Sequence, residues 1–168
     1  MALRIDFSAA PVIRHVFARS RGRHSLYPDA RARAAAARQL ADVCLRHAIS
    51  CIVWCMTDRC LHVVARGSAV SLALATEELA GARLRHGHAL STLVKLDLYL
   101  LEVARHALLS PVRGGLCRRA IDWPYSSAQH SCGYRPAPAW LDPTPLYELL
   151  GPRDERSGDR FRRFMDSS

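Results

Sequence analysis

Cys60 and His62 stand two residues apart in the stretch ISCIVWCMTDRCLHVVARG, residues 49–67. The stretch reads as two apolar strands joined by a tight polar turn at residues 57–59. Because successive strand residues point to opposite faces, the thiol and the imidazole share one face and Leu61 takes the other. The pair is consistent with a metal site, with a remnant of one, or with two core residues that alternate. The spacing alone leaves all three interpretations open.

The elements that must position this pair follow from the hydrophobic pattern of the chain. It predicts, in order, a strand at 12–19, a helix at 30–47 capped by Asp29, the two strands of 49–67, a helix from Ser68, a strand at 90–96, a helix that begins at Asp97 and ends before Pro111, and a short helix at 146–150. This order favours an α+β fold, namely a ferredoxin-like antiparallel sheet with helices on one face.

Length and composition predict one compact domain. About half of the 168 residues are apolar, which is enough for a core. We assign the domain to residues 1–150 and expect 151–168 to form a charged, flexible tail. No apolar run is long enough for a membrane span and the N-terminus lacks a signal-peptide core, so we expect a cytoplasmic protein without a membrane partner.

The six cysteines do not suggest a disulfide framework. They show no paired C-x-x-C spacing, and most lie in apolar runs, where a thiol behaves as a small hydrophobic group.

The charge of the chain points to nucleic acid. Lys+Arg 24 against Asp+Glu 15 gives a net charge of +9, and Lys95 is the only lysine. Guanidinium groups bind phosphate in a bidentate way and stack on bases, so DNA is the first partner to consider. A GC-rich genome would explain arginine in place of lysine, but not the excess of positive charge. The candidate contacts are Arg19, Arg21, Arg23, Arg66, Arg105, Arg113, Arg118 and Arg119.

Plainer interpretations exist for the same residues. The clusters 19–23 and 118–119 are also compatible with ordinary solvated surface, and Trp123, Tyr125 and Trp140 with anchoring of the C-terminal turns. Basic groups interleaved with aromatic rings are nevertheless what single-stranded DNA binding uses.

Three segments carry a resemblance to a known family. Residues 97–134, DLYLLEVARHALLSPVRGGLCRRAIDWPYSSAQHSCGY, resemble the C-terminal signature of the single-tyrosine HUH transposases, specifically the REP-associated tyrosine transposase group. In that group a helix ends in Arg-Tyr, and the elements Asn-Pro-Val-Arg-Ala-Gly and Tyr-Pro-Trp-Ser-Ser follow. Residues 14–33 resemble its first strand, basic turn and helix start, and WCMTDRCLHVVA, residues 54–65, resembles its Met-Pro-Asn-His-x-His-Leu-Leu strand.

The resemblance implies the HUH fold and a phosphoryl-transfer chemistry on single-stranded or hairpin DNA. In the family, two histidines of the strand and a polar side chain of the facing helix hold a divalent metal, Mg²⁺ or Mn²⁺. A tyrosine of that helix attacks the phosphate and becomes attached to a 5′ DNA end. The metal stabilises charge on the phosphoryl oxygens, and the covalent step divides one strand transfer into two.

Transferred residue by residue, the resemblance implies a degenerate active site. The two metal histidines fall on Cys60 and His62, the helix ligand on Ser110 and the nucleophilic tyrosine on His106, so only His62 keeps the family's residue type. The spacing from Met56 is one residue longer than the family's, so an ungapped alignment would place Arg59 and Leu61 at the two metal positions instead. Sulfur is a poor ligand for Mg²⁺ and Mn²⁺, serine is a weak one, and a phosphohistidine link to DNA would be unusual. Tyr99 is a fallback nucleophile, but it lies two turns before His106, about 10 Å along the helix axis.

The resulting hypothesis is a transposase-like DNA-binding protein that recognises single-stranded or hairpin DNA and has lost strand cleavage and transfer. One alternative is an active, metal-dependent DNA transposase with unusual ligands. Another is a ferredoxin-like protein-interaction module that does not bind DNA. The family contains both monomers and dimers, so a homodimer stays open.

Overall fold

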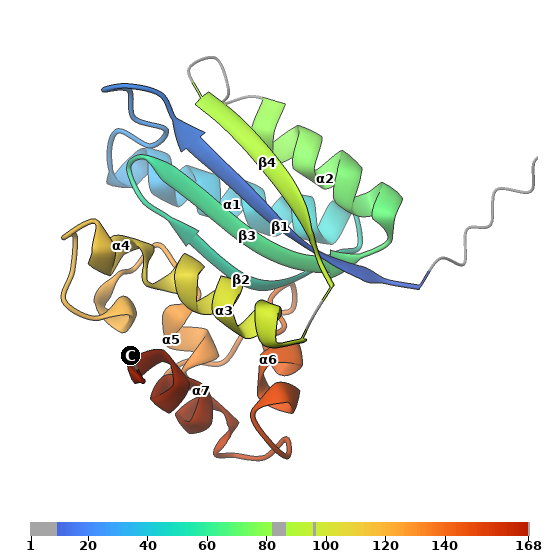
Figure 1. Cartoon of the computed structure of the whole chain (residues 1–168). Helices are drawn as coiled ribbons and strands as arrows, with labels where there is room; N and C mark the ends of the chain where they lie inside the picture. The colour runs from blue at the N-terminus through green and yellow to red at the C-terminus, as the bar shows by residue number, and fades with distance from the viewer. Residues whose placement is uncertain (1–9, 82–86, 96, 168) are drawn as a thin grey trace, which may run out of the picture.

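The computed structural model describes residues 10–81, 87–95 and 97–167 (Figure 1). Its centre is one antiparallel sheet with the strand order β2-β3-β1-β4. The strands are β1 (Val12–Ser20), β2 (Ser50–Met56), β3 (Cys60–Gly67) and β4 (Gly87–Val94). Helices α1 (Ala30–Arg46) and α2 (Ala69–Gly81) make the connections from β1 to β2 and from β3 to β4. The predicted ferredoxin-like α+β fold is therefore confirmed.

The remaining helices follow β4, and each is shorter than α1 and α2. They are α3 (Asp97–Leu108), α4 (Ser110–Arg113), the 3-10 turn η2 (Ala120–Asp122), α5 (Ala128–Ser131), α6 (Thr144–Leu149) and α7 (Ser157–Asp166). Pro111 divides α3 from α4, because its ring cannot join an uninterrupted helix. No helix among the described residues is long and apolar enough to cross a membrane.

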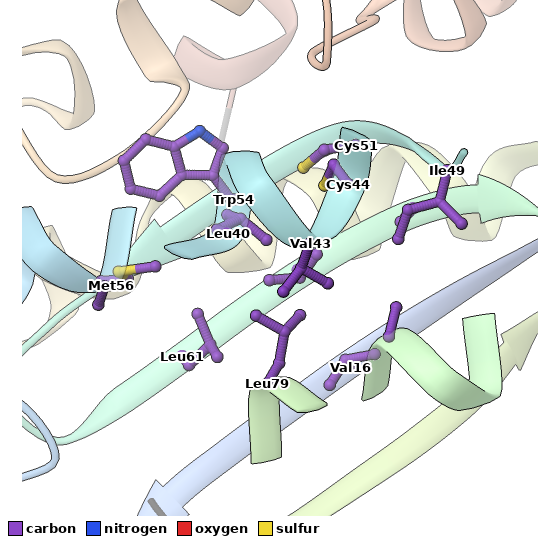
Figure 2. Packing of buried hydrophobic residues seen from close by; sticks show 14 of the residues in the cluster. Val16, Leu40, Val43, Cys44, Ile49, Cys51, Trp54, Met56, Leu61 and Leu79 are labelled. Atoms are coloured by element: carbon purple, nitrogen blue, oxygen red, sulfur yellow. The ribbon is translucent and has the colours of Figure 1, made fainter. Parts of the chain in front are cut away.

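Helices cover both faces of the sheet, where the sequence suggested one. Helices α1 and α2 pack on the first face over a core that includes Val43, Leu61 and Leu79 (Figure 2). Helix α3 packs on the second face, against β2 and β3, over a core that includes Val53 and Val64 (Figure 1). The strands alternate between these two cores, except at a register shift in β2, where Ile52 and Val53 both face the second core.

Individual boundaries agree closely with the sequence, except at β4. Asp29 caps α1 as expected, since its carboxylate accepts a hydrogen bond from the Ala32 amide at 2.7 Å. Strand β4 begins at Gly87 and ends at Val94, earlier than the predicted range 90–96, of which residue 96 lies outside the described residues. The polar residues before Leu90 concealed the start of this strand, because β4 is an edge strand that pairs with β1 alone.

The segment after α4 covers the outer edge of β2. Ser126 bridges to Cys55 and Leu141 to Cys51, and the Trp54 amide donates to the Ser127 hydroxyl at 3.0 Å. The Trp123 indole donates to the Met56 carbonyl at 2.8 Å. These contacts favour the anchoring interpretation of Trp123 and leave β4 as the free edge of the sheet.

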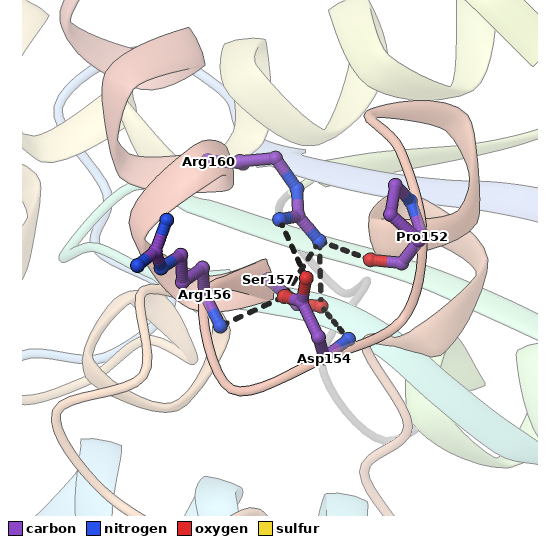
Figure 3. A network of polar contacts seen from close by, with 5 residues as sticks. All are labelled: Pro152, Asp154, Arg156, Ser157 and Arg160. Carbon is purple, nitrogen blue, oxygen red and sulfur yellow. Dashed lines mark hydrogen bonds and ion pairs between the residues drawn. The ribbon is translucent and has the colours of Figure 1, made fainter.

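The C-terminal residues are part of the domain, so the expectation of a flexible tail at 151–168 is wrong. Phe161 and Met165 of α7 are buried in the second core. Arg160 and Asp154 close the loop before α7 with an ion pair at 3.0 Å, and the Asp154 amide donates to the Ser157 hydroxyl (Figure 3). The charged composition hid two apolar side chains spaced four residues apart, which is the spacing of one helical face.

Candidate functional site

Three histidines from separate elements meet on the second face of the sheet. The antiparallel register places His62 of β3 opposite Phe17 of β1, and His15 lies two residues before Phe17 on the same face. The His15 Nε2 atom lies 3.1 Å from the His62 Nδ1 atom, and the two rings stack with centroids 5.3 Å apart. From α3, the His106 ring approaches His62 edge-on, with centroids 5.5 Å apart. We call His15, His62 and His106 the histidine cluster.

The histidine cluster is held in its neutral form. Burial, with smaller effects of His15, His106 and Arg113, lowers the pKa of His62 to about 3. Burial and the nearby His106 lower the pKa of His15 to about 4. Burial and the Arg113 guanidinium also lower the pKa of His106. Neutral imidazoles carry one donor and one acceptor each, so His15 and His62 can satisfy one another through a single shared proton.

Cys60 and Ser110 lie together, in a cavity beside the histidine cluster. The cavity has a volume of about 250 Å³, and Arg19, Arg59 and Asp58 also line it. Burial raises the pKa of the half-buried Cys60 thiol, although Arg19 opposes this shift, so the group is a thiol and not a thiolate at neutral pH. Ser110 is the first residue of α4 and reaches the same cavity from the opposite side.

The donors present do not fit Mg²⁺ or Mn²⁺. These ions require several oxygen ligands, whereas the three predicted ligands are a neutral thiol, a hydroxyl and an imidazole whose Nδ1 atom faces His15, and the cavity adds one carboxylate, that of Asp58. Within residues 10–81, 87–95 and 97–167, no group of three or more His, Cys, Asp or Glu side chains is arranged to hold a metal ion. The ligand roles assigned to Cys60, His62 and Ser110 therefore stay predictions.

Of the two nucleophile candidates on α3, the structure brings only one to the cluster. His106 contacts His62, and its side chain is otherwise exposed. The Arg113 guanidinium donates to the His106 carbonyl at 2.5 Å and so ties α4 to the end of α3. Tyr99 lies two turns earlier on α3 with 45% of its surface exposed. Its position suits a surface residue better than a partner of His62.

Comparisons with known proteins support the fold. No protein-family model matches the sequence, and no curated protein matches it. A solved structure described as the REP-associated tyrosine transposase bound to a REP hairpin is similar, with a TM-score of 0.59 and 12% sequence identity. The similarity covers 84% of this chain and 92% of that one. This chain shares the fold of that solved structure. At such low identity the likeness establishes the architecture and not the activity.

The fold separates the eight predicted DNA contacts into groups. Arg19 lines the Cys60 cavity, with exposed Arg21 and Arg23 in the adjoining loop. Arg118 and Arg119 line a second cavity on the other side of α4. Arg66 is exposed at the far end of β3 from Cys60, and the Arg105 guanidinium lies 5.4 Å from the Phe164 ring centroid. The structure therefore assembles two basic regions around α4, places Arg113 at the end of α4 itself, and leaves Arg66 and Arg105 outside both cavities.

Sequence reasoning missed the contact of His15 with the histidine cluster and the contribution of α7 to the fold. His15 sits in an alternating strand, but its contact with His62 depends on the register of β1 against β3, which no local pattern reveals. Arg59 was visible as a turn residue, and its guanidinium donates to the Gly22 carbonyl. The contact of Arg162 in α7 with Tyr134 was concealed by the assumption that residues 151–168 form a tail.

Proposed function

We propose that this chain is a transposase-like DNA-binding protein of the REP-associated kind, which recognises single-stranded or hairpin DNA and no longer cleaves or transfers strands. One observation carries the proposal. Strand β3 and helix α3 face each other in the way the family's chemistry requires, yet the groups that meet there are neutral imidazoles that contact one another. The scaffold is kept, and the metal-binding and nucleophilic groups are replaced.

Two further observations support DNA as the partner. The solved structure of similar fold is described as bound to a REP hairpin. The present chain carries a net charge of +9, and Arg19, Arg21 and Arg23 are exposed at one end of β1. Arginine contacts to phosphate release counterions, so they supply affinity that falls steeply with salt.

An active enzyme is the second candidate, because His106 is exposed and touches His62. A neutral imidazole can attack phosphorus as the bond from phosphorus to the leaving 3′ oxygen breaks, and that oxygen takes a proton from water, while the contact with His62 orients the attacking ring. Without suitable metal ligands, nearby guanidinium groups such as Arg113 would have to stabilise the charge on the phosphoryl oxygens. We rank this candidate second because it requires an unusual covalent link.

Binding of labelled hairpin DNA in a native gel tests the proposal. We expect the wild-type protein to shift a single-stranded hairpin at low salt, and to bind a blunt duplex of equal length less tightly. Substituting Arg21→Gln and Arg23→Gln together should weaken the shift, while Arg38→Gln on the exposed side of α1 serves as the matched control. Failure to shift any DNA at low salt would contradict the proposal and favour a protein-interaction module.

A further inference from the structure

A second cavity lies on the opposite side of α4 from Cys60. Its volume is about 280 Å³, and its floor is apolar, formed by Leu109, Val112, Ile121 and Met165. Cys132 also lines it, and burial raises the pKa of this thiol to about 11, so the floor carries no charge at neutral pH. The volume is near the lower limit of small-ligand pockets, roughly 300 Å³, which suits a single planar ring system. We call this cavity the α4–α7 pocket.

An aromatic ring is held at the edge of the α4–α7 pocket. Tyr134 is 52% exposed, so part of its ring surface is open to a ligand. The Arg162 guanidinium donates to the Tyr134 hydroxyl at 2.9 Å and also lies over the ring, 5.5 Å from its centroid. Asp159 pairs with Arg162 at 2.9 Å and fixes the guanidinium in turn. A ring held in place beside an apolar floor is a stacking platform that loses little entropy when a base binds.

The rim of the α4–α7 pocket is basic. Arg119 is engaged by Asp122 through two contacts of 3.0 and 2.8 Å. Arg118 is exposed, and no carboxylate in the described part of the chain pairs with it. Asp166 also lines the pocket and can accept a hydrogen bond from an amino group. An apolar floor, a fixed ring, a free guanidinium and one carboxylate together match a nucleobase that carries an amino group, with its phosphate outside.

One short helix, α4, separates the α4–α7 pocket from the cavity beside the histidine cluster. Helix α4 separates the two cavities, with Ser110 and Gly114 lining one and Leu109 and Val112 lining the other. A single strand that passes over α4 would therefore reach both cavities within a few nucleotides. A strand held at Arg19 in the first cavity can extend to Arg118 in the second.

On these grounds we infer that the α4–α7 pocket binds one unstacked base of single-stranded DNA, stacked on Tyr134, while Arg118 binds the adjoining phosphate. The inference rests on the proposed DNA binding and names the part of the DNA that this pocket takes. Adenine, cytosine and guanine carry an amino group for Asp166, and thymine does not, so we expect thymine to be disfavoured.

Abasic scanning combined with substitutions in the pocket tests the inference. Each nucleotide of the single-stranded part of a hairpin oligonucleotide is replaced in turn by an abasic one, and Kd is measured by fluorescence anisotropy. We expect one position to raise Kd by roughly 5- to 150-fold, the range for loss of one base–aromatic stack. Tyr134→Ala should raise Kd for the intact oligonucleotide by a similar factor and remove the effect of that abasic position. Tyr134→Phe keeps the ring and should retain most of the affinity.

Controls separate this inference from the proposed function. Arg118→Gln should weaken binding and reduce its salt dependence, whereas Leu74→Ala, at an exposed apolar residue of α2 on the other face, should leave Kd unchanged. Hairpin binding that is equal for wild type, Tyr134→Ala and Arg118→Gln would overturn the inference and leave the proposed function standing. No hairpin binding by the wild type would overturn both. Saturable binding of a free deoxynucleoside monophosphate, with no abasic effect in the oligonucleotide, would show a mononucleotide site instead and contradict the inference.

Discussion

At the scale of single residues, the histidine cluster determines which chemistry the candidate site can perform. His62 is 2% exposed, and its ring is enclosed by His15, Phe17 and His106. A buried imidazole that has to stay neutral couples folding to pH, because protonation is easier in the unfolded chain. The His62 Nδ1 atom contacts His15, so a metal ion would have to bind the other ring nitrogen, Nε2.

We predict that the protein loses stability as the pH falls below about 6.5. The pKa values of His62 and His15 in the folded chain are about 3 and about 4, against an ordinary value of 6.5. Between these values the unfolded chain binds more protons, so the stability is fully present above pH 6.5 and decreases as pH falls toward 4. Each histidine contributes a slope of up to about 1.4 kcal/mol per pH unit. Denaturant unfolding at several pH values measures this slope.

Substitutions in the histidine cluster test whether His15 and His62 cause that pH dependence of stability. Replacing His15 and His62 together by glutamine should flatten the curve between pH 6.5 and 4, and His24→Gln, at an exposed residue outside the cluster, should not. An unchanged slope in the double variant would show that carboxylates elsewhere produce the acid sensitivity.

A second prediction concerns the missing metal ligands. Replacing Cys60 by histidine and Ser110 by asparagine introduces two better donors on either side of the Cys60 cavity. We expect the double variant to bind Mn²⁺ measurably by isothermal titration calorimetry, and the wild type to show weaker binding or none. Adding His62→Gln to the double variant should abolish the gain. Equal Mn²⁺ affinity of wild type and double variant would contradict our account of the donor set.

At the scale of elements, the decisive feature is the packing of α7 onto the helices that follow β4. Phe161 is fully buried in the same core as Leu108 of α3 and Leu146 of α6. We predict that Phe161→Ala lowers the free energy of unfolding by about 3–5 kcal/mol, because it leaves a large cavity. Arg163→Ala, at an exposed position of α7, should change it little. Chemical denaturation measures the free energy of unfolding of both variants. A small effect of Phe161→Ala would support the prediction of a flexible tail instead.

A close backbone contact fixes the start of α7. A Cβ atom at Gly158 would lie 2.7 Å from the Gly133 Cα atom, so only glycine allows α7 to approach α5 this closely. We predict that Gly158→Ala destabilises the fold by about 1–3 kcal/mol, as expected for overpacking. Gly81→Ala at the end of α2 meets no atom of the described residues within 4 Å and should be neutral or slightly stabilising. Thermal unfolding of the two variants distinguishes these outcomes, and equal melting temperatures would contradict the close contact.

Some elements could be predicted from the sequence, and the contacts between distant elements could not. Alternation in VIRHVFAR and in the 49–67 hairpin predicted β1, β2 and β3 almost to the residue, since local period and turn chemistry decide such elements. The placement of Cys60 and His62 on one face followed from the same alternation. The contact of His15 with His62 and the cavities around α4 could not be predicted, because they depend on pairing register and on helices distant in sequence.

At the scale of the whole molecule, the protein combines an antiparallel α+β fold with an excess of arginine. The net charge is +9, and the basic groups near the two cavities come from β1, the loop after α4 and α7. Binding to single-stranded DNA should therefore depend on salt, with a slope of log K against log[salt] of about −0.7 for each phosphate contact. We predict that Arg19→Gln reduces this slope by about that amount, while Arg66→Gln, outside both cavities, leaves it unchanged. Anisotropy titrations at several NaCl concentrations measure the slopes, and equal changes in the two variants would show that charge acts without a defined binding path.

The central claim is that this chain binds hairpin DNA but has lost strand cleavage. The most direct measurement incubates the protein with 5′- and 3′-labelled hairpin DNA in the presence of Mg²⁺ or Mn²⁺, and divides each reaction between a native and a denaturing gel. Our account predicts a shifted complex on the native gel and, on the denaturing gel, only intact DNA without a protein adduct. A covalent adduct or a cleaved strand that requires His106 would contradict it, and would identify an active transposase with a histidine nucleophile.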